Sequence, residues 1–402
     1  MPVRFTPMIL HDLSSALVRS NPDYRFVPFS GLAAAELESL GELPSDQNLA
    51  GVLFYHGTGG LGAKAVDADT VTLFTQCTTS QPVAALLRQL PPAKRDHIIA
   101  GLILDAVLEV GVGDGFVSSA AAYTALIACE DSTTDFASLE RLSLAAIKHC
   151  QNLTMLPATD LAAKLYFYNR HPATRQWREL WPDPQAVLNS LRASSGEPLH
   201  RHLGEHYHCP SPTIVSPGWL VWIGRRWKRT SSDNAPIFKL YLSPAPQHFQ
   251  LVFGEATSLL SSSGCGCFKI GMNAYNLLRP DKFVLYFDQM ANLLAYSTRL
   301  EKRLTGVSAH GVPFSAQLDG QGCLSWGVDP PHQKTPPWIS DESWRIWICN
   351  RLAVGLKSAA GCATASVPPW RFALTKLWFA GIDTRDWTPR AFPAEPPMTM
   401  SA

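Results

Sequence analysis

The sequence predicts an α+β protein: a helix-rich N-terminal region, residues 1–205, followed by a second domain, residues 206–402, with a small mixed or antiparallel sheet flanked by helices. Apolar residues recur at helical spacing through much of the first region. In the second domain, several runs carry an apolar residue at every second position, the period of a half-buried strand. These runs cover 237–243, 267–271 and 282–287.

Composition narrows the class of protein. A chain of 402 residues can bury a substantial core. A net charge of +1 with 17% charged residues argues against a nucleic-acid surface recognised by bulk charge. Nine cysteines without a secretory signal indicate reduced thiols in a cytosol. No apolar run approaches the roughly 18 residues of a membrane span, so we expect a cytoplasmic protein with neither a membrane nor a nucleic-acid partner.

The chain opens with two expected short helices, 8–20 and 32–40, and a strand at 51–56. The following GTGGLG, 57–62, matches the G-x-G-x-x-G dinucleotide fingerprint. That fingerprint requires a helix to begin at once, so that its N-terminus faces the pyrophosphate. Residues 63–76 instead alternate like another strand, which favours a glycine-rich hairpin loop.

The rest of the N-terminal region reads as mainly helical. Apolar stripes predict helices over 81–112, interrupted by a Pro-Pro pair, over 136–150, and in two pieces over 177–193. Residues 162–168 fit a strand or a helix equally well. We regard this region as a domain with peptide binding as its candidate role.

One dense group of potential metal ligands stands at the junction, in LHRHLGEHYHC: His200, His202, His206, His208 and Cys209. On strands, the first two histidines would share one face and the last two another. The spacing fits no standard zinc pattern, so a polar loop is favoured over a metal enzyme. The segment is also a candidate lip that supplies a proton donor. No metal and no cofactor are expected.

The alternating runs of the second domain define a polar face. Phe238, Leu240 and Leu242 share one side of the first strand. If the apolar sides pack on helices, the opposite side gathers Lys239, Tyr241, Lys269, Lys282 and Tyr286, with Arg279 at its rim. Such a cationic surface with phenol groups suits an anionic ligand, above all a phosphate.

Further elements complete this domain. Apolar periodicity predicts helices over 247–262, 290–304, 342–360 and 372–380. The second of these carries Arg299 and Arg303, which we add as candidate phosphate contacts. Glycine-punctuated alternation over 311–328 predicts a hairpin.

A family resemblance appears in the same stretch. FKIG followed by LLRPDKFVLYF is similar to the pattern of the HopA1-like family, which belongs to the phosphothreonine lyase group. The resemblance continues through GVPFSAQL and FAGIDTRDW and spans roughly residues 235 to 390. Relatives occur in bacterial effectors and in lanthipeptide and thioamitide biosynthesis, where they eliminate phosphate from phosphoserine or phosphothreonine to leave a dehydroamino acid. The resemblance implies a lyase-like domain over 206–402.

Residue by residue, the resemblance implies Lys269 as the base, Arg279 as the phosphate clamp, and Lys239 with Tyr286 as supporting contacts. Crowding by other cations would pull the pKa of a lysine base toward neutrality. Phosphothreonine lyases place a general-acid histidine two residues after the first lysine, whereas this chain has Tyr241. Three alternatives follow. Tyr241 replaces the histidine, or a histidine from elsewhere reaches in (His248, His310 or the 200–208 cluster), or only binding remains.

The sequence therefore predicts a lyase-like protein of ribosomal-peptide (lanthipeptide-type) modification, without a kinase motif of its own. Its expected partners are a precursor peptide and a separate Ser/Thr kinase of the aminoglycoside-phosphotransferase type. Three alternatives stay open: a non-catalytic phosphopeptide- or leader-peptide-binding subunit, an enzyme using a metal at 200–209, and an aromatic prenyltransferase with K-x-Y strands lining a closed barrel.

Overall fold

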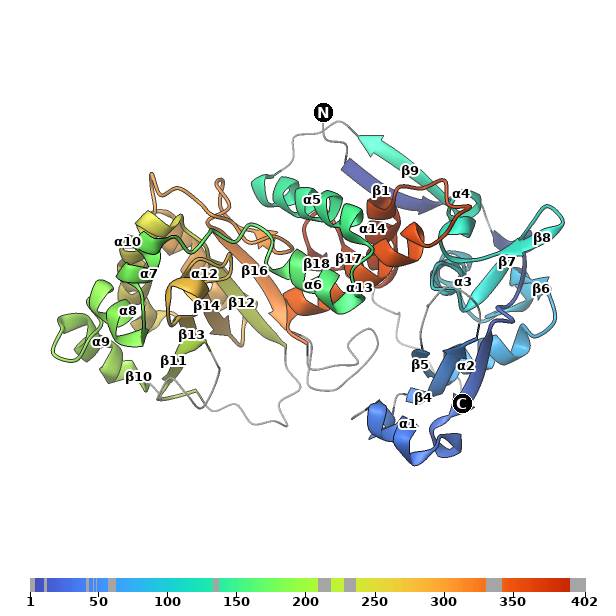
Figure 1. The fold of residues 1–402 in the computed structure, drawn as a ribbon, viewed down its shortest axis with the longest axis horizontal. Helices are drawn as coiled ribbons and strands as arrows, with labels where there is room; N and C mark the ends of the chain where they lie inside the picture. Colours follow the sequence, from blue (N-terminus) through green and yellow to red (C-terminus); the bar gives the residue numbers. More distant parts are fainter. Residues whose placement is uncertain are drawn as a thin grey trace, which may run out of the picture.

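A computed structural model describes residues 4–10, 13–40, 43–45, 47, 49–56, 63–132, 137–208, 218–227, 236–329 and 342–390. The α+β class is confirmed. An antiparallel sheet with its covering helices forms one end of the molecule, a helical layer lies in the middle, and the N-terminal strands form the other end (Figure 1).

The helices are α1 (Ala34–Ser39), α2 (Ala68–Gln76), α3 (Pro92–Leu104), α4 (Tyr123–Leu126), α5 (Ser138–Cys150), α6 (Ala158–Tyr166), α7 (Arg175–Leu180), α8 (Pro184–Ser190), α9 (Pro198–His206), α10 (Phe249–Ser258), α11 (Ala274–Leu277), α12 (Met290–Glu301), α13 (Trp344–Ala360) and α14 (Pro369–Phe379). The strands are β1 (Arg4–Ile9), β2 (Leu17–Ser20), β3 (Tyr24–Pro28), β4 (Leu49–Tyr55), β5 (Ala63–Asp67), β6 (Gln81–Pro82), β7 (Leu108–Val112), β8 (Gly115–Val117), β9 (Ile127–Ser132), β10 (Tyr207–His208), β11 (Trp219–Gly224), β12 (Ile237–Leu242), β13 (Cys265–Gly271), β14 (Phe283–Phe287), β15 (Ala316–Gln317), β16 (Leu324–Asp329), β17 (Ile382–Asp383) and β18 (Thr388–Pro389).

The sheet that positions the site has seven strands, in the order β10-β11-β13-β14-β12-β16-β15, with every pair antiparallel. The three alternating runs form β12, β13 and β14, and the predicted hairpin is β15 with β16. Strand β11 was not predicted, because its WLVWIG run is apolar on both faces and lacks alternation. Among the described residues the sheet is open, with two-residue strands at both edges, and this contradicts the closed barrel of the prenyltransferase alternative.

Helices α10 and α12 cover the apolar face of this sheet. Leu240, Phe268 and Leu285 point into a core that also holds Phe253 and Tyr296 of these two helices. All five side chains are fully buried. The alternation read from the sequence thus has the expected cause: every second residue of each strand is removed from water.

The opposite face of the sheet looks toward the middle layer, where α5, α6, α13 and α14 pack into one apolar cluster. Close approach of α13 requires a residue without a side chain on β16. A Cβ atom added to Gly327 would lie 2.6 Å from the Trp344 ring. Glycine at this position therefore lets the first turn of α13 lie directly on the sheet.

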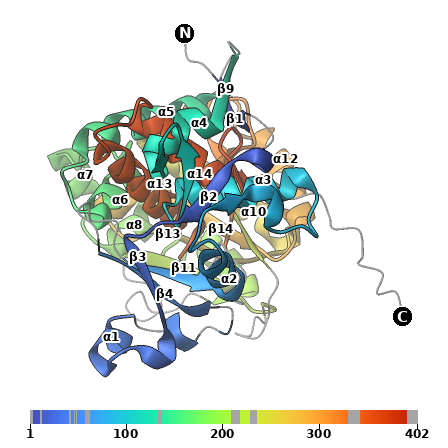
Figure 2. The ribbon, with the colours of Figure 1, turned by 90° about the vertical axis from the view of Figure 1, so that its right-hand side faces the viewer.

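The N-terminal region has more strands than the sequence predicted. The described residues of 8–20 form the end of β1, a short 3-10 turn and β2 rather than a helix, and 108–112 form β7. These strands pair with segments far away in sequence, β1 with β9 and β2 with β7. Figure 2 shows this strand-rich end facing the viewer.

Strands β4 and β5 pair antiparallel, so the glycine-rich run between them connects a hairpin, as expected. The run itself, 57–62, lies outside the described residues. The expected strand over 63–76 is half right, since β5 ends where α2 begins. Asp67 caps α2 by accepting the Thr70 backbone N–H at 2.7 Å.

Hydrophobic cores cross the predicted domain boundary at residue 205. Ala359 of α13 and Phe372 of α14 pack into the core of the N-terminal strands. Conversely, Val187 of α8 and Leu203 of α9 pack into the core of the seven-stranded sheet. The division at 205 stays a prediction. Among the described helices, none has the length and apolar character that crossing a membrane requires.

Candidate active site on the polar face of the sheet

Three adjacent strands bring the predicted lysines and tyrosines to one face. Lys239 of β12 lies opposite Tyr286 of β14. On the other side of β14, Lys269 of β13 lies opposite Val284, which also faces Tyr241 of β12. All five residues occupy alternate positions, so their side chains project from the sheet on the side away from α10 and α12.

Lys269 lies over aromatic rings at the centre of this face. Its Nζ is 4.3 Å from the centroid of Trp219 and 5.7 Å from that of Tyr286. Burial, joined by the charges of Lys239 and Arg279, lowers the pKa of Lys269 to about 8 despite the opposing carboxylates. The ammonium therefore loses its proton close to neutral pH, as a general base must.

Lys239 is fixed by an ion pair. Its Nζ lies 2.5 Å from Oδ2 of Asp329, at the end of β16, and 5.2 Å from the centroid of Tyr286. The other oxygen of Asp329 accepts the backbone N–H of Trp344 at 3.1 Å. One carboxylate therefore ties the lysine to the first turn of α13.

Arg279 belongs to a buried network centred on Asp281. Its Nε and Nη2 each donate to this carboxylate at 3.0 Å, and Nη2 also lies 2.9 Å from the Tyr166 hydroxyl. The same carboxylate accepts from Tyr166 at 2.8 Å and pairs with Arg345 Nη1 at 3.0 Å. The guanidinium carbon of Arg279 stands 4.9 Å from the Trp219 centroid. Lys269 and Arg279 therefore contact the same indole ring.

This network restricts what Arg279 can do. Burial would raise the pKa of Asp281, but the charges of Arg279 and Arg345 outweigh it and hold that pKa well below its usual range. The Asp281 carboxylate is therefore charged and occupies two nitrogens of Arg279. Nη1 is the nitrogen that these contacts leave for a ligand.

Sequence reasoning missed most of this network. Asp281 belongs to the LLRPDKFVLYF stretch of the family pattern but was not among the predicted site residues. Arg345 interrupts the apolar stripe of α13 and is 1% exposed, and a charge inside such a stripe was the available signal. Tyr166 and Trp219 carried no signal of their own, because each reaches the site through tertiary contacts.

Tyr241 and Tyr286 lie on the predicted face, but their surroundings oppose proton transfer. Burial raises the pKa of Tyr241 well above its ordinary value, and the nearby Asp329 carboxylate raises it further. Tyr286 is shifted in the same direction for the same two reasons. Both hydroxyls stay protonated at neutral pH and are weak acids. The cations on this face do not make Tyr241 the stronger acid that a replacement for histidine would need to be.

Lys282 immediately precedes β14 and does not join the other lysines at an aromatic ring. Its Nζ donates to the Pro244 carbonyl at 2.8 Å and lies 2.6 Å from Nδ1 of His310. Burial lowers the pKa of Lys282 to about 7, while burial and Lys282 together lower the pKa of His310. The ammonium is 0% exposed, so the predicted phosphate contact through Lys282 is replaced by contacts within the protein.

Arg299 and Arg303 are placed on the opposite side of the sheet. Arg299 is an exposed residue of α12, which covers the apolar face. Arg303 donates to Glu255 at 3.2 Å and to Ser258 at 3.1 Å, both on α10. The structure therefore does not bring either arginine to Lys239 and Lys269.

The histidines considered as replacements for the missing acid also lie elsewhere. His310 is half-buried beside Lys282, and His248 accepts the Ser308 N–H at the start of α10. The polar loop favoured for 200–208 is mostly helix α9, which packs on the helix-covered core through Leu203. Cys209 lies outside the described residues.

The face as a whole offers more positive than negative charge. Four cationic side chains (Lys239, Lys269, Arg279 and Arg345) surround two carboxylates (Asp281 and Asp329), an excess of two when all are ionised. The Trp219 ring contacts both Lys269 and Arg279. This excess of positive charge favours an anion over a cation, and it lies beside a lysine whose pKa is lowered to about 8.

Compared with known proteins, the sequence matches no protein-family model and no curated protein. Solved structures do resemble it. An effector protein from Pseudomonas syringae pv. tomato strain DC3000 is 13% identical, with a TM-score of 0.39, covering 63% of this chain and 98% of that one. The phosphothreonine lyase OspF from Shigella flexneri is 15% identical, with a TM-score of 0.26, covering 45% and 90%. The phosphothreonine lyase effector VirA from Chromobacterium violaceum is 12% identical, with a TM-score of 0.28, covering 51% and 99%. At this distance the function of those proteins does not transfer to this chain. The function of this chain has to be inferred from its own residues.

Proposed function

We propose that this protein is a carbon–oxygen lyase that eliminates phosphate from a phosphorylated serine or threonine in a peptide. One observation carries the proposal: Lys269, with a pKa lowered to about 8, lies over the same indole ring as Arg279. β-Elimination requires a base and, next to it, a group that binds the phosphate.

The neutral amine of Lys269 takes the α-proton of the phosphorylated residue. The electron pair of that C–H bond forms the Cα–Cβ double bond, and the Cβ–O bond to phosphate breaks. Nη1 of Arg279 and the Lys239 ammonium receive the charge that develops on the departing phosphate. A phosphomonoester has a second pKa of about 6, so above that pH it reacts as the dianion. The proton that Lys269 has taken from Cα then passes to the departing phosphate, which leaves as HPO₄²⁻ and returns Lys269 to the neutral amine. Under this scheme Tyr241 positions the substrate rather than acting as the acid.

We further propose that the substrate is a precursor peptide phosphorylated by a separate Ser/Thr kinase, and that the product carries a dehydroamino acid for later ring formation. The resemblance of FKIG and LLRPDKFVLYF to the HopA1-like family supports this role.

The test is an incubation of the purified chain with paired phosphoserine and phosphothreonine peptides. Mass spectrometry should detect loss of phosphoric acid, and a thiol should add to the new double bond. Lys269→Met should abolish the product, whereas Lys302→Met, a lysine at the far end of α12, should leave it unchanged. No dehydrated product from any phosphopeptide with the wild-type chain would overturn the proposal.

A second function, phosphopeptide binding without turnover, is favoured by a different observation. Two of the three guanidinium nitrogens of Arg279 already contact Asp281, and Tyr241 is a weak acid. Under this alternative, wild type and Lys269→Met bind the phosphopeptide and neither converts it. Titration of binding alongside the mass assay separates the two functions.

A further inference from the structure

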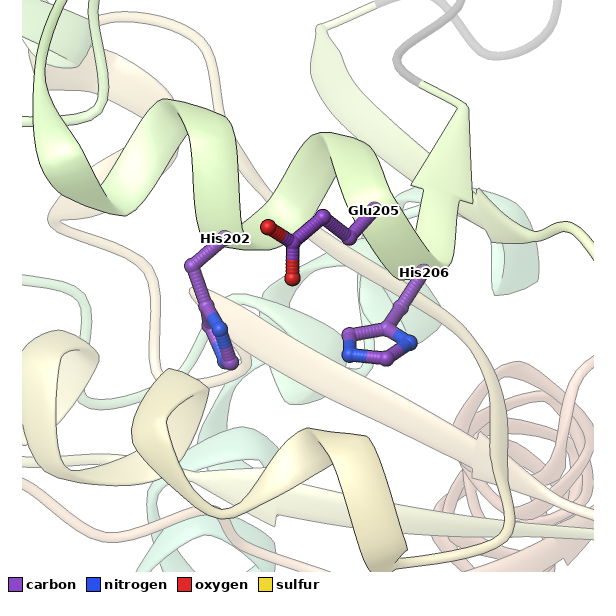
Figure 3. Close-up of side chains that lie close together, drawn as sticks. All are labelled: His202, Glu205 and His206. Atoms are coloured by element: carbon purple, nitrogen blue, oxygen red, sulfur yellow. The ribbon is translucent and has the colours of Figure 1, made fainter.

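The last turns of α9 bring three metal-binding side chains together. His202, Glu205 and His206 each offer one ligand atom, and these atoms all lie within 4.8 Å of one another. The two imidazole centroids are 5.6 Å apart. Figure 3 shows the three side chains on one side of the helix, with the carboxylate between the rings.

Helical geometry is the reason for this grouping. Residues three and four apart on a helix are neighbours, with Cβ atoms about 5–6 Å apart. In an extended strand, His202 and His206 would be about 13 Å apart. A strand would instead pair His202 with His200, whose Nδ1 lies 3.2 Å from the Ala193 carbonyl oxygen. The polar loop favoured from the sequence is therefore a helix, and the helix brings His206 rather than His200 to His202.

One ring nitrogen of His202 is buried without a partner. The Nε2 of His202 is inaccessible to solvent and makes no hydrogen bond within the described part of the chain. Leaving a buried polar atom unsatisfied costs about 1–3 kcal/mol. A ligand at this nitrogen would remove that cost, and a metal ion is the ligand that the two neighbouring side chains can share with it.

The electrostatic surroundings accept positive charge. His206 is the last residue of α9, and the C-terminal end of a helix carries partial negative charge. Arg225 already occupies part of this end, where its Nε and Nη2 donate to the Gly204 carbonyl at 3.0 and 2.8 Å. The Glu205 carboxylate adds a formal negative charge on the side facing the imidazoles.

We propose that His202, Glu205 and His206 bind one divalent transition-metal ion, with zinc the best match. Two imidazoles and one carboxylate are a ligand set that zinc adopts, leaving a fourth position for water. In a tetrahedral site with bonds of about 2.1 Å, ligand atoms lie about 3.4 Å apart. Glu205 and His206 are exposed, so rotation of their side chains can close the difference.

The site is separate from the proposed elimination chemistry. Helix α9 packs through Leu203 into the core on the apolar side of the sheet, while Lys269 lies on the other side. The ion would instead tie the last turn of α9 just before the chain enters edge strand β10. Metal binding should therefore stabilise this edge of the fold and leave phosphate elimination unchanged.

The test uses the full chain, stripped of metal with a chelator and titrated with zinc chloride by calorimetry. One ion per chain should bind in the micromolar range, and excess zinc should raise the thermal midpoint by a few degrees. Affinity should fall in acid, because protons compete for the imidazoles. Separate His202→Ala and His206→Ala variants should each weaken binding at least about tenfold, and Glu205→Gln should weaken it less.

His200→Ala is the matched control, since His200 is an exposed histidine on the same helix but outside the group. It should bind zinc as the wild type does. Equal loss in the control, or a wild type that binds no more tightly than the His202→Ala/His206→Ala double variant, would overturn the proposal. Circular dichroism establishes that each variant is folded before its affinity is compared.

Discussion

The two faces of the seven-stranded sheet are made by the same strands and have opposite properties. On β12, Leu240 is fully buried beneath α10 and α12, while its neighbour Lys239 pairs with Asp329 on the other side. On β13, Phe268 stacks on Trp222 at 4.8 Å, and the next residue is Lys269. The alternation of the strands places the buried apolar side chains on one face and the charged side chains on the other.

The difference teaches where substitutions will act. The helix-covered face is filled with apolar side chains, so changes there should alter the free energy of unfolding. The polar face holds cations that carboxylates and aromatic rings keep in place, and the proposed elimination depends on these cations. Substitutions of these cations should therefore alter turnover. The following predictions separate these two effects.

The largest effect is expected at Lys269. Replacement by Met keeps the length of the side chain and removes the base, which should lower the rate of phosphate release by about 10² to 10⁴-fold. Lys302→Met is the control and should match the wild type. A Lys269→Met variant with wild-type turnover would remove the base from the mechanism.

On the other face, Leu285→Ala should lower the free energy of unfolding by about 2–5 kcal/mol, because it leaves a cavity beneath α10 and α12. Urea titration measures this change. Leu251 of α10 is 51% exposed, so the free energy of unfolding of Leu251→Ala should stay within about 0.5 kcal/mol of the wild-type value. The folded fraction of Leu285→Ala should keep its turnover, and loss of turnover at full folding would show that the faces are coupled.

Arg279→Lys should reduce kcat/KM by about 10²-fold, since a lysine cannot both hold Asp281 through two nitrogens and reach phosphate. The paired control is Arg303→Lys, an arginine that the sequence also assigned to phosphate but that contacts α10. It should have no effect. Comparable losses in the two variants would contradict the placement of the phosphate site on the polar face.

The smallest effect is expected at Tyr241. Burial and Asp329 raise the pKa of this phenol, so Tyr241→Phe should change kcat by less than about tenfold, below the usual value of a general acid. Steady-state kinetics at pH 7 measures it. A loss above about 10²-fold would restore Tyr241 as the proton donor.

The sequence predicted the polar face well because strand alternation is a local property. Lys239, Lys269 and Tyr286 follow from period-two patterns that tertiary structure preserved. Lys282 has the same alternation as these residues, but its Nζ contacts the Pro244 carbonyl and His310 instead of the other lysines. No local sequence pattern predicts these contacts. Likewise the helix carrying Arg303 was expected, but the side of the sheet on which it packs was not.

The N-terminal strands and α9 were missed for a related reason. Strand β1 pairs with β9, more than a hundred residues later, so its backbone conformation depends on a partner that propensity does not include. In α9, a histidine-rich segment of low helix propensity forms a helix because Leu203 docks on the sheet core. The Asp281 network joins residues from α6, α13 and the turn before β14, and depends entirely on the tertiary fold.

The pH dependence of phosphate release tests the central role of Lys269 most directly. Since the amine acts as base only when unprotonated and its pKa is lowered to about 8, kcat/KM should rise from pH 6 and level off above about 8. Lys269→Met should lack this rise. A wild-type rate that stays flat from pH 6 to 9, or a wild type that releases no phosphate at any pH, would contradict Lys269 as the base.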